Sequence, residues 1–150
     1  MGLFDRLRRR RPEPLPEYAD DGTLVVLLTA PDAARADSAV LAEAAAAGVD
    51  LAQPLLVRHH LVGLPDDAAV ARAGELLGQD GYTLTVLPGP PYDVRAWRTQ
   101  VLTPLSAAQE RSRMAGLAQR LGGDVAGYDA LGPLPATAGG PGPQGAGPQA

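Results

Sequence analysis

The chain has 150 residues, of which 45% are hydrophobic, so it is long enough for one domain with a real core. It contains no cysteine, which excludes disulfides, thiolate metal sites and cysteine nucleophiles. The formal net charge of -4 hides an asymmetry, because residues 1–11 carry five arginines and one acid, whereas residues 12–150 carry eight arginines and sixteen acids. The acidic body is expected to repel nucleic acid, and only the N-terminal end could attract it.

Both ends of the chain are predicted to be disordered tails, at residues 1–21 and 133–150. The first tail combines a few apolar residues with the arginines between Arg6 and Arg11 and then a proline-rich linker. Two alternatives exist for it: a solvated tail, or a short basic amphipathic turn that touches anionic lipid or RNA. From residue 132 onward there is no charge, and eleven of nineteen residues are glycine or proline, so this segment cannot bury a core.

The apolar runs are far too short to span a membrane, and no apolar segment typical of a secretory signal follows the N-terminal charges. A cytoplasmic protein is therefore expected. The domain itself is predicted at residues 22–132. Its first element is a strand at residues 23–30, which lacks alternation between apolar and polar residues and is therefore predicted to be buried on both faces. Pro31 and Asp32 suit the start of an alanine-rich helix at residues 32–47, which Gly48 ends.

The segment at residues 54–64 is the longest β-favouring run in the middle of the chain, and it holds both histidines. Neighbouring side chains of a strand point to opposite faces. His59 shares a face with three apolar residues, so it is predicted to be buried. His60 shares the other face with Arg58 and is predicted to lie beside it at a partly wet surface.

Four further elements follow the central strand. Asp66 is predicted to cap a helix at residues 67–78. Residues 82–87 alternate as a strand, and residues 95–103 complete a hairpin after a proline-rich turn. Ser106 and Gln109 fit a capping box for a helix that runs to about residue 121. Residues 124–131, with Tyr128 and Asp129, are predicted to form the last strand.

The order of elements from residue 54 onward is strand, helix, strand, strand, helix, strand. Two split βαβ halves of this kind form a four-stranded antiparallel sheet with both helices on one face. The predicted fold class is therefore α+β, a ferredoxin-like two-layer α/β sandwich, and the strand and helix at residues 23–47 are an N-terminal addition.

No group of residues predicts catalysis, a metal site or a cofactor. The two histidines point to opposite faces of one strand, so they cannot chelate one ion together, and no further ligands lie at a suggestive spacing. The serines lack the context of a nucleophile elbow, and the Asp66–Asp67 pair suits a helix start. The aromatic residues of the body lack the basic surroundings of an RNA-binding sheet, so core packing is the favoured role for Tyr82 and Trp97.

Several short motifs follow one another along the domain in an order that is specific when they are taken together. They are Gly48-Val49-Asp50, Val57-Arg58-His59-His60-Leu61, Gly81-Tyr82-Thr83-Leu84-Thr85-Val86, Arg113-Met114-Ala115-Gly116-Leu117-Ala118, Gly122-Gly123-Asp124 and Tyr128-Asp129-Ala130-Leu131-Gly132. This pattern, over about residues 32–132, resembles the regulator of ribonuclease activity B family. The closing strand of that family usually reads Tyr-Asp-Gly-Trp-Gly, and this chain departs from it at Ala130 and Leu131.

The resemblance implies a small cytoplasmic protein without enzymatic activity that binds ribonuclease E and inhibits or redirects RNA cleavage. It marks His59, His60, Tyr128 and Asp129 as family residues, which we expect mostly to shape the fold. From the charge we add the hypothesis that Asp66, Asp67 and Glu75 contact an arginine-rich surface of the nuclease. The alternative is a protein that acts on RNA or a membrane surface through its arginine-rich N-terminal tail.

Overall fold

The computed structural model describes residues 15–31 and 35–134. The arginines between Arg6 and Arg11 and the predicted disorder of residues 1–14 and 135–150 lie outside the described residues. The predicted helix start at Asp32 is wrong, because the helix begins at Asp37 and the Ala36 before it is extended. The domain boundaries at residues 22 and 132 stay predictions.

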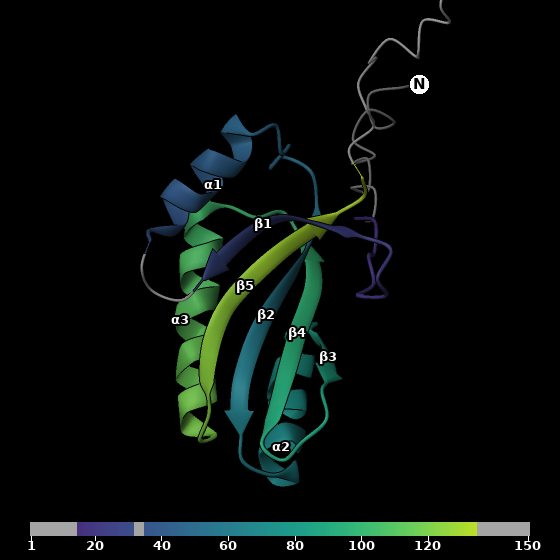
Figure 1. Cartoon of the computed structure of the whole chain (residues 1–150). Coiled ribbons are helices and arrows are strands. Elements are labelled where there is room, and N and C mark those ends of the chain that lie inside the picture. The colour runs from purple at the N-terminus through teal and green to yellow at the C-terminus, as the bar shows by residue number, and fades with distance from the viewer. Residues whose placement is uncertain (1–14, 32–34, 135–150) are drawn as a thin grey trace, which may run out of the picture.

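Within the described residues, three helices pack against one five-stranded antiparallel sheet (Figure 1). In chain order the elements are β1 (Val25–Pro31), α1 (Asp37–Ala46), β2 (Leu55–Leu64), α2 (Asp67–Gly78), β3 (Thr83–Val86), β4 (Tyr92–Gln100), α3 (Pro104–Arg120) and β5 (Asp124–Gly132). The strands lie in the order β1-β5-β2-β4-β3, so the strand with both histidines is the middle one. The predicted α+β class and the antiparallel sheet are confirmed.

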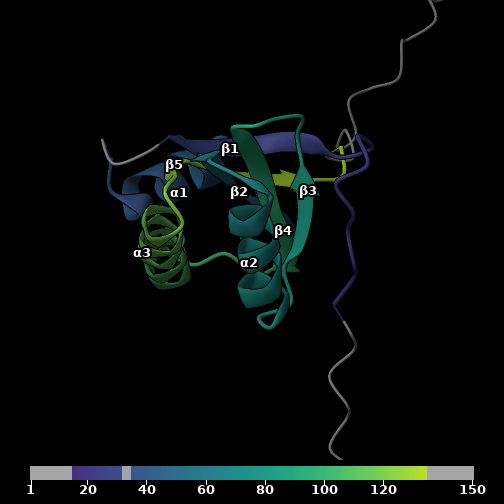
Figure 2. The ribbon, with the colours of Figure 1, turned by 90° about the horizontal axis from the view of Figure 1, so that it is seen from below.

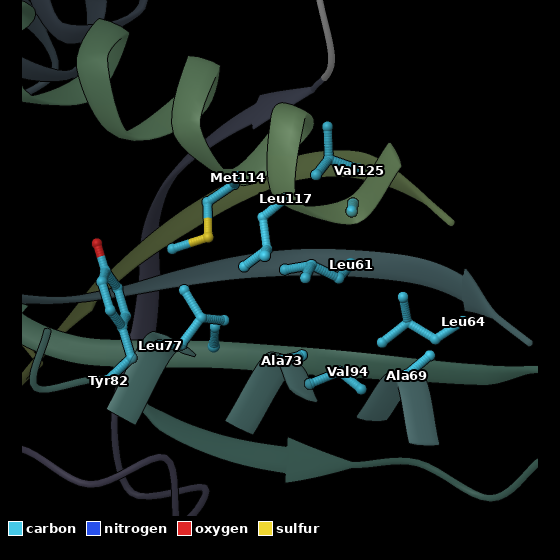
Figure 3. Close-up of a cluster of buried hydrophobic side chains, with 12 residues drawn as sticks. Leu61, Leu64, Ala69, Ala73, Leu77, Tyr82, Val94, Met114, Leu117 and Val125 are labelled. Carbon is cyan, nitrogen blue, oxygen red and sulfur yellow. The ribbon is translucent and has the colours of Figure 1, made fainter. Parts of the chain in front are cut away.

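All three helices cover the same face of the sheet (Figure 2). The alternation of β2 explains this, because every second side chain points to the helices and is buried there. These side chains are Leu55, Val57, His59 and Leu61. One core cluster lies between α2, α3 and the sheet, where Leu77, Met114 and Leu117 meet Leu61 (Figure 3). The helix residues that face it recur at helical spacing in both helices.

A second core cluster lies under α1. Val40, Leu41 and Ala44 of α1 pack against Leu28 of β1 and Tyr128 of β5. The two clusters meet along β2, which contributes its N-terminal half to one and its C-terminal half to the other. The added strand and helix thus extend the same two-layer arrangement and do not form a separate unit.

The prediction that the first strand is buried on both faces is wrong. β1 lies at an edge of the sheet and pairs only with β5. From Leu28 onward buried and exposed residues alternate, and Leu28 and Ala30 face the helices. A register shift lies between Leu28 and Val26, which is 50% exposed. A continuous apolar run does not distinguish an edge strand from a central one, because the sequence does not state what covers its second face.

Two further element boundaries differ from those expected. Thr103, and not Ser106, is the N-cap of α3: its hydroxyl accepts a hydrogen bond from the Ser106 amide, and the Ser106 hydroxyl accepts one from the Thr103 amide. Pro104 occupies the first turn, where its missing N–H carries no penalty. The second strand of the hairpin runs from Tyr92 to Gln100, earlier than predicted, because Thr103 and Pro104 already belong to the helix start.

Candidate functional site

The sheet face that is turned away from the helices, which we call the open face, carries a polar stripe across all five strands. The register places side chains of successive strands opposite one another, in the order Thr29, Asp129, Arg58, Trp97, Thr83 from β1 to β3. Beside this row, His60 of β2 lies opposite Arg95 of β4. The two histidines of β2 therefore lie on opposite faces of the sheet, as the alternation of the strand predicts.

Asp129 is the centre of an ionic network on the open face. Its carboxylate accepts hydrogen bonds from Arg58 Nη2 at 3.0 Å and Thr29 Oγ1 at 3.0 Å, and lies 2.7 Å from His60 Nε2. Burial raises the pKa of Asp129, but the bonds from His60 and Arg58 outweigh it and lower the pKa to about 2. The carboxylate is thus held charged between a guanidinium and an imidazole.

A segment before β1, residues 18–23, which we call the strap, lies on this network. The Tyr18 amide donates to Thr99 Oγ1 at 2.9 Å. Asp20 Oδ1 accepts from Arg58 Nη1 at 2.7 Å, and its Oδ2 lies 3.9 Å from Arg95 Nη1. The Asp20 side chain is only 7% exposed. Residues 18–21 of the strap belong to the predicted disordered tail and residues 22–23 to the predicted domain, and the structure adds that the strap contacts β2 and β4.

A groove of about 730 Å³ runs beside the strap. Residues 15–19 form one wall, and Trp97, Thr99 and Thr83 line the sheet side. Core packing was the expected role of Trp97, and that prediction is wrong, because its ring is half-buried on the open face and its Nε1 donates to Thr85 Oγ1 at 3.1 Å. The register of β4 turns Ala96, and not Trp97, toward the helices.

His59 lies on the other face of β2, in the core. It is 3% exposed and packs against the rings of Tyr82 and Tyr128, with centroids 6.1 and 5.5 Å away. Its Nε2 lies 3.6 Å from Glu110 Oε2 and makes no hydrogen bond. The expectation that His59 is buried and His60 lies beside Arg58 is confirmed.

Glu110 of α3 is the only buried carboxylate of this core region among the described residues. It accepts hydrogen bonds from Tyr82 Oη at 2.9 Å and Gln100 Nε2 at 2.7 Å, and pairs with Arg98. Burial raises the pKa of Glu110, but His59, Gln100, Tyr82 and Arg98 outweigh it and lower the pKa to about 2. Burial and the Glu110 charge in turn raise the pKa of Tyr82.

Tyr128 closes the core where α1 and α3 meet β5. It is 1% exposed, its hydroxyl donates to Asp37 Oδ1 at 3.3 Å, and Arg111 pairs with the same carboxylate oxygen at 2.8 Å. Burial and the Asp37 charge raise the pKa of Tyr128 to about 12, so the phenol stays protonated. Tyr128 and Asp129 are adjacent in sequence but serve the core and the open face respectively.

The three acidic candidates lie on α2, on the helix side of the sheet, and the structure does not bring them together with His60 and Asp129. Asp66 caps α2, accepting from the Ala69 amide at 2.8 Å, as predicted. Asp67 accepts from Tyr92 Oη at 2.5 Å. Glu75 is exposed and pairs with Arg72 at 3.0 Å.

Sequence reasoning missed two residues that organise these networks. Glu110 lies four residues before Met114 on the apolar stripe of α3, and a charge on such a stripe is a signal that could have identified it. Asp20 carries no comparable signal, because its partners Arg58 and Arg95 are distant in the sequence.

Among residues 15–31 and 35–134, no three His, Cys, Asp or Glu side chains are grouped so that they could hold a metal ion. In the same part of the chain, no helix has the length and apolar character needed to cross a membrane.

A family model described as "Regulator of ribonuclease activity B" matches residues 34–130. No curated protein and no solved structure matches the chain. The matched stretch contains the His-His strand and most of β5, whereas β1 and the strap lie outside it.

Proposed function

Because the chain belongs to the regulator of ribonuclease activity B family, whose members are non-catalytic regulators, we propose that it binds a ribonuclease E-type nuclease in the cytoplasm and inhibits or redirects its cleavage of RNA. The observation that carries this proposal is the match over residues 34–130, which spans α1 to β5. The protein would act by covering a surface of the nuclease, without transforming a substrate.

The charge of the folded body supports association with a basic surface. Residues 15–31 and 35–134 carry fourteen acids and eight arginines. Complementary charge accelerates the encounter of two proteins and orients them. The exposed acidic residues of α2, Asp67 and Glu75, with the capping Asp66 beside them, are proposed as contacts to an arginine-rich segment of the nuclease.

We also infer that β2 to β5 form a ferredoxin-like sandwich, with β1 and α1 as an addition. The spatial order β5-β2-β4-β3 and the shared core of α2 and α3 support this assignment. In that arrangement the helix layer and the open face lie on opposite sides of the sheet, so substitutions can test each surface separately.

The binding proposal is tested with the full chain and the purified ribonuclease E-type nuclease of the same host. Saturable binding is expected, and no binding at micromolar concentrations would refute the proposal. Glu75→Lys is the cleanest variant for the acidic contact, because Asp66 caps a helix and Asp67 bonds Tyr92. Glu43→Lys is the matched control, since Glu43 is also an exposed acid in a surface pair, but on α1.

If α2 contacts the nuclease, Glu75→Lys slows association severalfold at low salt and Glu43→Lys changes it less, about as expected from net charge alone. Equal effects would remove α2 from the interface. The alternative function, RNA or membrane association through the arginines between Arg6 and Arg11, is tested by deleting residues 1–11. Retained nuclease binding favours the body, and lost binding favours the tail.

A further inference from the structure

The open face is already occupied by a peptide, and that peptide belongs to the chain itself. The strap lies over β2 and β4, donates one backbone hydrogen bond to Thr99 and inserts the Asp20 carboxylate between Arg58 and Arg95. The neighbouring Asp21 instead turns back to Thr23, with its Oδ1 2.6 Å from the Thr23 hydroxyl, and stays exposed. The contacts of the strap therefore indicate which ligand groups the open face binds: a backbone N–H and one carboxylate.

The fit of the strap is incomplete. Asp20 Oδ2, Arg58 Nε and Arg95 Nε are buried and have no hydrogen-bond partner. Nearly all buried polar atoms of folded proteins are paired, and a guanidinium presents a fork that suits two carboxylate oxygens at once. The two arginines thus retain donors that Asp20 does not use, and a carboxylate placed by a longer segment could use them.

We propose that the open face is a second docking surface for the partner, in addition to the acidic contacts proposed on α2, that it accepts an extended acidic segment of that partner at Arg58 and Arg95, and that the strap is a resident occupant which the partner displaces. This inference rests on the proposed function, because it names a second surface through which the regulator would hold its nuclease. The strap lies outside the stretch that matches the family, so the proposal for the strap is drawn from the structure of this chain alone.

An acidic peptide suits this surface better than RNA does. The occupant already present is an extended peptide with a carboxylate, and the groove beside it offers the half-buried Trp97 and the hydroxyls of Thr83 and Thr99 for peptide contacts. The excess of acids over arginines in the described residues repels a polyanion at long range, whereas a short segment with one or two carboxylates meets only the local arginine pair.

If the partner displaces the strap, substitutions that weaken the strap change the affinity for the partner in a defined direction. A tethered occupant competes at a high effective concentration, so the apparent affinity for the partner equals the intrinsic affinity multiplied by the fraction of molecules whose open face is free. Weakening the strap should therefore strengthen partner binding, although it removes a contact from the free protein. A strap that merely supports the fold, or that belongs to the interface, gives the opposite sign.

The first experiment uses the strap itself as the probe. A synthetic peptide with the sequence of residues 15–22, capped at both ends, is titrated into the full chain, and the emission of Trp97, the sole tryptophan, is followed. The Asp20→Asn chain is expected to bind this peptide about tenfold more tightly than the unaltered chain, because its own strap competes less. A peptide with asparagine in place of Asp20 should bind neither the unaltered chain nor the Asp20→Asn chain. Asp21→Asn is the matched control and should behave as the unaltered chain.

Two results would overturn the proposal at this stage. One is an Asp20→Asn chain that responds to the peptide no more than the unaltered chain does. The other is a single-stranded oligoribonucleotide that binds the Asp20→Asn chain more tightly than the peptide, which would make the face an RNA surface.

The second experiment measures nuclease binding by the full chain and three variants. Asp20→Asn should bind several times more tightly and Arg95→Gln several times more weakly, whereas Arg35→Gln, which removes an exposed arginine paired with Glu43, should change little. Arg95 is chosen because, within residues 15–31 and 35–134, it pairs only with Asp20, whereas Arg58 also pairs with Asp129. If no variant binds nuclease, the proposed function fails. If all bind and Asp20→Asn is unchanged or weaker, the docking proposal fails and the proposed function stands.

Discussion

Replacing Glu110 by glutamine tests how the buried network of α3 stabilises the fold. Glu110 is 9% exposed and accepts hydrogen bonds from Tyr82, Gln100 and Arg98. These interactions, with His59, overcome the effect of burial and lower the pKa of Glu110 from 4.5 to about 2. A shift of this size corresponds to about 3 kcal/mol when it is fully transmitted, and partial solvent screening reduces the expected stabilisation to about 2 kcal/mol.

The direction of the pKa shift sets the pH dependence. Because the folded-state pKa lies below the ordinary value, the stabilisation is complete above about pH 5 and is lost as the pH falls toward the folded-state pKa. Glutamine carries no charge that titrates. The difference in the free energy of unfolding between the unaltered chain and Glu110→Gln should therefore be about 2 kcal/mol at neutral pH and roughly 1 kcal/mol smaller near pH 3.5.

Urea unfolding followed by Trp97 fluorescence measures this difference at both pH values. Glu75→Gln is the control, because Glu75 is exposed and holds only Arg72, so its loss should change stability by less than about 0.5 kcal/mol. A difference for Glu110→Gln that is the same at neutral and acidic pH would refute the reasoning, since it would show that the charge of Glu110 does not contribute.

Four further substitutions test the fold by denaturation. Gly127→Ala should lower the free energy of unfolding by at least about 2 kcal/mol, because φ is 107° and the new Cβ would lie 2.2 Å from the Ala30 carbonyl oxygen; a neutral effect would contradict the β1–β5 register. Gly116→Ala in α3 meets nothing within 4 Å and should raise it by about 0.5–1 kcal/mol, and a loss would show hidden crowding. Thr103→Ala should cost about 1 kcal/mol through the lost N-cap, and no cost would disprove the assigned helix start. Asp129→Asn should cost about 1 kcal/mol at neutral pH and less below about pH 4, as the pKa of about 2 requires; a constant cost would contradict that pKa.

Local patterns predicted the elements on which the fold depends. The alternation in β2 assigns His59 to the core and His60 to the open face, because a strand leaves each side chain only one of two directions. Both ends of the helix at residues 67–78 agree with the prediction, since Asp66 caps its first turn and a turn follows Gly78. Such features are decided by neighbours in the sequence.

The features that the sequence did not reveal depend on distant partners. Asp20 lies 38 residues before Arg58, and no local pattern indicates that an extended segment returns to the open face at that point. The exposure of Val26 depends on the register shift between Val26 and Leu28, which arises from the pairing of β1 with the distant β5. Core packing was favoured for Trp97 because the aromatic residues lack the basic surroundings of an RNA-binding sheet, but the register of β4 decides its face.

The most direct test of the account is a cleavage assay with the purified ribonuclease E-type nuclease, an RNA substrate and rising amounts of the full chain. Cleavage by the nuclease is expected to decrease or to move to other sites, the effect is expected to saturate near equimolar protein, and the chain alone should leave the RNA intact. Unchanged cleavage at saturating protein, or cleavage of RNA by the chain without the nuclease, would contradict it.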